Sequence, residues 1–193
     1  FVKKNYPDSK SDLFAVFIEK CNEFAKQNGF YAMITQHAFM FLSSYEKLRT
    51  KLLTKTTVNM AHLGARAFDE IGGEVVQTTA FVNYNSHIKE YKGTYARLVD
   101  VNGEAEKEKL FLSVENRHTA KQENFSKIPG SPIAYWVSQK MFKIFTFEKS
   151  IEEYIFFRQG MATSDNNRFL KCWFEVLFLK IGFSINNLVD AKI

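Results

Sequence analysis

Apolar residues near the start of the chain recur first at helical spacing and then in a nearly unbroken run. Ser9 lies three residues before Asp12, a capping pattern, and apolar residues three and four apart predict an amphipathic helix from Asp12 to Gln27. Gly29 can take the left-handed conformation that ends a helix. The apolar run 30–35 is typical of a strand covered on both faces. The helical stripe comprises Leu13, Phe17, Cys21 and Phe24, with Phe14, Ile18 and Ala25 on its flank.

Helix and strand patterns continue to alternate as far as residue 101. Ser43 and Glu46 form a capping-box pattern that predicts a helix to about Leu53. Three strands are predicted after it, at 57–63, 75–84 and 93–101. The last two have no long helix between them, which predicts an antiparallel, hairpin-like edge. This order is that of the second half of an open, mostly parallel α/β sheet, with the first half absent.

Beyond residue 101 the alternation is lost and the pattern predicts mainly helices. Glu104 to Leu112 is a charged helix candidate, and Ser131 before a proline predicts a helix that runs to about Phe145. The end of the chain is aromatic-rich without a clear period. We predict three portions: an α/β portion over 1–101, a helical connecting segment over 102–149, and an irregular α+β segment over 150–193.

The composition of the 193 residues excludes several classes of protein. With 46% hydrophobic residues, 24% charged residues and 3 prolines, the chain is not of the disordered or low-complexity kind. It has no uncharged apolar run long enough to span a membrane. Cys21 and Cys172 are far apart, which predicts a reduced, cytoplasmic protein. The net charge of +5 is spread along the chain and fits a nucleic-acid partner without demanding one.

Most local motifs for chemistry are absent from the chain. There is no Walker loop, no glycine-rich dinucleotide motif and no His-Glu-x-x-His zinc motif. The four histidines lack metal-ligand spacing, so we predict that they are structural or exposed and that the chain has no metal site. They are His37, His62, His87 and His118.

The order of several segments along the chain carries a more specific signal. One of them contains the run Leu63-Gly64-Ala65-Arg66-Ala67-Phe68. In sequence order, the segments are Lys4–Glu19, Asn28–Arg49, Ala61–Val82, Ile128–Val137 and Phe157–Phe169. Together they resemble the part of the adenine-N6 DNA methyltransferases that follows the catalytic Asn-Pro-Pro-Tyr motif and leads into target recognition. The closest resemblance is to the large enzymes of BREX and phage-growth-limitation defence systems.

The resemblance implies a Rossmann-like fold that transfers a methyl group from S-adenosylmethionine to adenine N6 in double-stranded DNA. Residues 1–101 would be the C-terminal half of the catalytic domain, and 150–193 the start of the target-recognition region. The glycine-containing S-adenosylmethionine motif and the Asn-Pro-Pro-Tyr motif would both precede Phe1. We therefore expect a piece of a longer enzyme that is inactive alone. Its partners would be DNA and other phage-defence proteins, not a membrane.

The resemblance also suggests roles for individual residues. Phe68 occupies the position of the aromatic that packs on the extruded adenine, although a core position is the alternative. Leu13 and Phe17 would border the adenine ring of S-adenosylmethionine, or else pack against the sheet. The candidate DNA contacts are Arg158, Asn166, Asn167 and Arg168, types that bind phosphates and sugars. An ordinary solvated turn is equally compatible with that last group.

Two other hypotheses remain open at this point. The chain could be a non-catalytic DNA-binding or specificity module, whose binding would depend on salt and on the basic residues Arg158 and Arg168. It could also be a truncated remnant of a methyltransferase reading frame.

Overall fold

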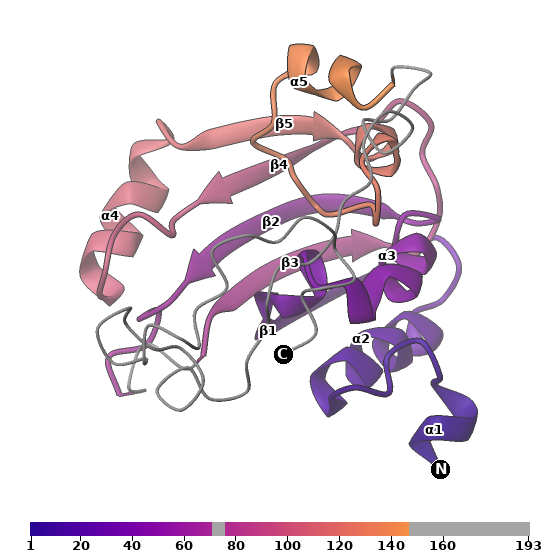
Figure 1. The fold of residues 1–193 in the computed structure, drawn as a ribbon. Helices are drawn as coiled ribbons and strands as arrows, with labels where there is room; N and C mark the ends of the chain where they lie inside the picture. Colours follow the sequence, from indigo (N-terminus) through magenta and orange to yellow (C-terminus); the bar gives the residue numbers. More distant parts are fainter. Residues whose placement is uncertain (71–75, 147–193) are drawn as a thin grey trace, which may run out of the picture. The chain divides into compact units, whose positions relative to one another are not determined.

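The computed structural model describes residues 1–70 and 76–146 (Figure 1). The chain divides into two compact units, Phe1–Glu148 and Lys149–Ile193, and the described residues all lie in the first. The helices are α1 (Val2–Asn5), α2 (Leu13–Phe24), α3 (Glu46–Leu52), α4 (Glu104–Ser113) and α5 (Gln139–Ile144). The strands are β1 (Phe30–Gln36), β2 (Thr56–Gly64), β3 (Thr78–Tyr84), β4 (Lys92–Arg97) and β5 (Arg117–Lys121). Three 3₁₀ helices complete the set: η1 (His37–Met40), η2 (Ser43–Tyr45) and η3 (Gln122–Lys127).

The five strands form one mixed sheet in the order β1-β3-β2-β4-β5 (Figure 1). β3 is antiparallel to both β1 and β2, while β4 is parallel to β2 and β5 is antiparallel to β4. β1, β2 and β4 therefore run in the same direction. The α/β class predicted from the sequence is confirmed. The expected pairing of the last two predicted strands is wrong, because β2 lies between β3 and β4 in the sheet.

The two faces of the sheet differ in what covers them. One face carries the buried side chains Tyr31, Met60, Phe81 and Tyr95, which pack with residues of α2, α3 and η1 into the hydrophobic core. On the opposite face Phe30, Ala32 and Ile34 of β1 are exposed. The sequence predicted a strand covered on both faces, which is wrong for β1 within the described part of the chain. The apolar run is present, but α2, α3 and η1 cover only one side of β1.

Helix α2 has the predicted period with a different buried face. It begins after Asp12, whose carboxylate accepts a hydrogen bond of 3.4 Å from the backbone N–H of Phe14. Asp12 is thus the N-cap, rather than Ser9. The buried positions are Ala15, Val16 and Ile18, whereas Leu13, Phe17 and Phe24 of the predicted stripe are exposed.

The segment after residue 127 departs most from the sequence-based prediction. Ser131 has a positive φ of 48° and does not start a helix. The chain instead runs extended over the core, where the Ile133 N–H donates to the Met40 carbonyl at 3.0 Å. Helix α5 begins only at Gln139, where the hydroxyl of Ser138 accepts from the Met141 N–H. Burial of Ile133, Ala134 and Tyr135 in the core stabilises the extended conformation more than the Ser131 capping pattern stabilises a helix.

Two further elements differ in kind from what the pattern predicted. The capping box at Ser43 and Glu46 does not form, because Ser43 starts η2 and Glu46 starts α3 without a side-chain cap. The segment 102–149, predicted to be helical, also contains β5, which pairs with β4. The three-part division of the chain stays a prediction.

Candidate functional site

The carboxyl ends of the three co-directional strands lie along one edge of the sheet. β1 ends before His37, β2 ends at Gly64 and β4 ends at Arg97. Ligands of open α/β sheets bind outside the carboxyl ends of the strands. The candidate Phe68 follows β2 at this edge, which makes the edge the candidate site.

The first, described part of the loop that carries Phe68 is held at Gly64 and by contacts of Arg66 and Asp69. Gly64 has a φ of +69°, and a Cβ there would lie 2.8 Å from Cγ1 of Val99, so only glycine fits. The Gly103 N–H donates to the Arg66 carbonyl at 3.2 Å, and the Glu104 N–H donates to Oδ1 of Asp69 at 3.3 Å. The start of α4 thereby anchors the loop. The Phe68 side chain is 39% exposed, which leaves ring surface available to a ligand.

The side chain of Lys107 in α4 binds backbone carbonyls at the same edge of the sheet. Its ammonium donates to the carbonyls of Leu63 and Leu98 at 2.7 Å and of Val101 at 2.6 Å. The carbonyls of Leu63 and Leu98 lie at the ends of β2 and β4, and that of Val101 lies in the loop after β4. One ammonium therefore links the ends of the two strands immediately before the Phe68 loop. Burial lowers the pKa of Lys107, and the nearby carboxylate of Asp100 opposes that change. Sequence patterning missed this residue, since a lysine in a charged helix resembles a solvated one.

The other predicted site residues do not meet Phe68 among the described contacts. Leu13 and Phe17 lie on the exposed stripe of α2, with side chains 61% and 57% exposed. They are accessible to a cofactor, and their contact with S-adenosylmethionine stays a prediction. The four candidate DNA contacts lie outside the described residues: Arg158, Asn166, Asn167 and Arg168.

A hydrogen-bonded chain of three side chains lies on the core-facing side of the same edge. Nδ1 of His37 is 2.7 Å from Nε2 of His62, and Nδ1 of His62 is 3.0 Å from the Tyr135 hydroxyl. Burial, with smaller contributions from His37 and Arg97, lowers the pKa of His62 to about 4. Burial also lowers the pKa of His37 and raises that of Tyr135 to about 12. All three groups are therefore neutral at pH 7.

The sequence offered one signal for the histidine pair. His37 follows the first predicted strand and His62 lies near the end of the second, and parallel strands bring their carboxyl ends to one edge. The sequence did not place Tyr135 beside them. It predicted a helix from Ser131, whereas Tyr135 lies in the extended segment before α5.

The buried histidine pair predicts a specific dependence of stability on pH. Between its ordinary pKa of 6.5 and about pH 4, His62 carries a proton in the unfolded chain but not in the folded one. The free energy of unfolding should therefore fall as the pH falls through this window, by about 3 kcal/mol from His62. Urea denaturation at a series of pH values measures the slope, and His62→Gln should flatten it. His87→Gln, which alters an exposed ring, is the control and should leave the slope unchanged. An unaltered slope in His62→Gln would contradict the assignment.

Comparison with known proteins finds relatives of this chain. Residues 1–68 match the model of the Eco57I restriction-modification methylases. The adenine-specific methyltransferase PglX of Lacticaseibacillus casei is 50% identical over 190 residues, and the adenine-specific methyltransferase BrxX of Escherichia coli is 53% identical over 139 residues. This chain is similar to these two adenine-specific methyltransferases along most of its own length. It corresponds to one segment of them, since the alignments cover 95% and 72% of this chain but 16% and 12% of those relatives.

The resemblance inferred from the order of the segments is thus confirmed for this methyltransferase family. Among solved structures, the methyltransferase subunit of a type I restriction-modification system from Streptococcus thermophilus aligns with a TM-score of 0.47 and 14% identity. That alignment covers 67% of this chain and 32% of the subunit. Within residues 1–70 and 76–146, no helix is long and apolar enough to cross a membrane.

Proposed function

We propose that this chain is the C-terminal half of the catalytic domain of a phage-defence DNA methyltransferase. The whole enzyme transfers a methyl group from S-adenosylmethionine to adenine N6 in double-stranded DNA. The observation that carries the proposal is the 50% and 53% identity to two adenine-specific methyltransferases over a small segment of each. The cofactor-binding glycine motif and the Asn-Pro-Pro-Tyr motif are absent from this sequence, so the chain alone is inactive.

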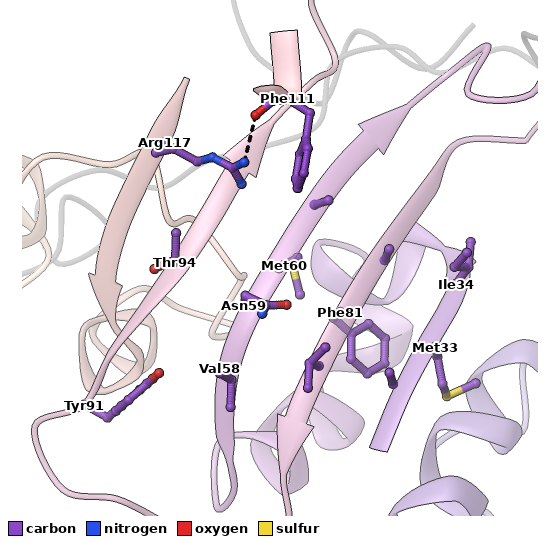
Figure 2. Close-up of a pocket in the computed structure, with 14 residues that line it drawn as sticks. Met33, Ile34, Val58, Asn59, Met60, Phe81, Tyr91, Thr94, Phe111 and Arg117 are labelled. Carbon is purple, nitrogen blue, oxygen red and sulfur yellow. Dashed lines mark hydrogen bonds between the residues drawn. The ribbon is translucent and has the colours of Figure 1, made fainter. Parts of the chain in front are cut away.

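Within the described residues, the sheet face opposite the hydrophobic core is largely open, and this supports the proposal. A hollow of about 680 Å³ crosses β1, β3, β2 and β4. Figure 2 shows the side chains that line it. Its floor is mostly aliphatic, with Ile34 of β1, Val82 of β3 and Ala61 of β2, and Phe111 of α4 lies at one side. α/β sheets of this class carry helices on both faces. The hollow is where helices from the remainder of the catalytic domain would pack.

The outer edge of β1 supports the same proposal. Within the described part of the chain β1 pairs only with β3, so its other edge can accept a strand. The exposed stripe of α2 lies in the sequence directly before this strand. In the whole enzyme, a strand that precedes the catalytic motif would pair with β1 and bring that motif to the carboxyl-end edge. Phe68 would then stack on the flipped adenine, and Leu13 and Phe17 would border the cofactor.

A chimaeric enzyme tests the proposal directly. The segment of the L. casei relative that aligns with this chain is replaced by this chain, and methyl transfer from labelled S-adenosylmethionine to adenine-containing DNA is measured. We expect the chimaera to methylate DNA and the isolated chain to remain at background. Methylation by the isolated chain would refute the claim that the catalytic half lies elsewhere. A folded chimaera that binds DNA without methylating it would favour the specificity-module hypothesis.

Phe68→Ala in this chimaera tests the stacking role. Stacking of a base on an aromatic ring is worth about 1–3 kcal/mol, so kcat/KM should fall by about 5- to 150-fold. Phe68→Tyr should retain most of the activity, because the ring is kept. Phe145→Ala is the control, since that ring is also about half exposed but follows α5. Equal losses in Phe68→Ala and Phe145→Ala would argue against stacking.

A further inference from the structure

Trp136 is an exposed aromatic ring held in a fixed position. Its side chain is 40% exposed, yet two other rings hold it. The ring of Phe41 lies 5.7 Å away, and that of Tyr135 meets it edge-on at 4.9 Å. The guanidinium of Arg97 lies over the indole, 5.4 Å from the ring centroid. Such a ring loses little conformational freedom when a flat ligand stacks on it.

The rings behind Trp136 are themselves fixed. Tyr135 stacks on the fully buried Tyr95 with centroids 4.9 Å apart and planes 4° from parallel. Its hydroxyl is 3.0 Å from His62, which in turn contacts His37. The hydrogen bonds that link His37, His62 and Tyr135 therefore fix the Tyr135 ring, on which Trp136 packs. Because the two imidazoles are neutral at pH 7, they add no charge to the surface.

Arg97 is a cation that an anion in solution can reach. Among the described residues its ion pair is with Asp100, three residues along the chain, with Nε 3.1 Å from Oδ2. The Asp100 side chain is 69% exposed, so this pair is weak and open to exchange. A phosphate could replace Asp100 at the guanidinium and gain a charge-assisted hydrogen bond. The protein carries a net charge of +5, which favours such an anion.

We propose that Trp136 and Arg97 form a contact site for single-stranded DNA, in which an unpaired base stacks on the indole and its phosphate binds the guanidinium. The residue types match the aromatic and basic combination of single-strand binding surfaces. The site lies at the carboxyl-end edge of the sheet, because Arg97 ends β4 in register with His62 of β2. The inference rests on the proposed function, since flipping an adenine leaves its partner base unpaired.

The test uses the 193-residue chain with Trp173→Phe, which leaves Trp136 as the one remaining tryptophan. A short oligodeoxythymidylate, titrated at low salt, should quench its fluorescence, and a duplex of equal length should quench it less. Trp136→Leu, followed with a labelled oligonucleotide, should weaken binding about 5- to 150-fold, and Trp136→Phe should restore most of it. Arg97→Gln should weaken binding and reduce the salt slope by about 0.7.

The opposite face of the sheet supplies a matched control. Arg117 of β5 lies over the ring of Phe111, 4.0 Å from its centroid, in the same kind of pair. Arg117→Gln should change oligonucleotide affinity less than twofold. Equal losses of oligonucleotide affinity in Arg97→Gln and Arg117→Gln would contradict the proposed site. So would Trp136 fluorescence that stays unquenched when the oligonucleotide is saturating.

These measurements are independent of methyl transfer. If the chimaera methylates DNA but the Trp136 variants bind the oligonucleotide normally, the proposed function stands and the site fails. Binding that depends on Trp136 in a chain whose chimaera is inactive would sustain the site and refute the proposed function. Circular dichroism of each variant confirms that it is folded. Preferential quenching by an acidic peptide over the oligonucleotide would assign the surface to a protein partner and overturn the proposal.

Discussion

Replacing Lys107 with methionine should lower the free energy of unfolding by about 3–5 kcal/mol. The side chain is 4% exposed, and its ammonium serves three backbone carbonyls at the ends of β2 and β4 and in the loop after β4. Methionine keeps the length and the apolar stem of the side chain but removes all three donors. The carbonyls of Leu63, Leu98 and Val101 would lose this donor within the protein, and each unsatisfied group costs about 1–3 kcal/mol. Water that enters would recover part of this energy, which keeps the expected total below the simple sum.

Lys109→Met is the matched control for that change. Lys109 lies two residues further along α4 with an exposed side chain, so the same substitution there should change stability by less than about 0.5 kcal/mol. Urea denaturation of the two variants measures the difference. In the chimaeric enzyme Lys107→Met should also lower the rate of methylation, because its ammonium anchors the strand end from which the Phe68 loop starts. Similar stability in the two variants would show that Lys107 is not a structural cation.

Replacing Arg49 with methionine should cost about as much, about 3–5 kcal/mol. Arg49 lies on α3 and is 1% exposed. Its Nε and Nη2 donate to the Gly130 carbonyl at 2.9 and 2.6 Å, while Nη1 donates to the carbonyls of Phe39 and Leu42 at 2.9 and 2.7 Å. One planar guanidinium thus donates hydrogen bonds to three carbonyls from two separate segments of the chain. Arg49→Lys should recover only part of the loss, because an ammonium cannot reproduce the fork.

Lys47→Met controls for the loss of a positive charge on the same helix. Lys47 is exposed, so thermal or urea denaturation should show little change for this variant. Arg49 also joins the turn that carries Phe41 to the loop that leads into Trp136. Its loss should therefore loosen the rings around Trp136 and shift the tryptophan emission to longer wavelength before global unfolding. A stable Arg49→Met with native emission would contradict this account.

Local patterns in the sequence were sufficient to predict the element types over the first hundred residues. The period of α2, the apolar run of β1 and the strand that became β2 each depend on residues close together in the chain. The order of the family segments pointed to the methyltransferase family, which the relatives confirm. Prediction failed at Ser131, where a good capping sequence lies in a segment that packs on the core.

The sequence by itself determined the α/β class, most strands and helices, and the family, because these follow from short-range periodicity and linear order. Tertiary structure alone decided which polar residues are buried and which rings meet. Arg49 and Lys107 look like ordinary solvated residues of charged helices until carbonyls from distant segments surround them. His37, His62 and Tyr135 come together only through strand order and register, which pair residues far apart in the chain. Such long-range contacts leave no periodic trace in the sequence.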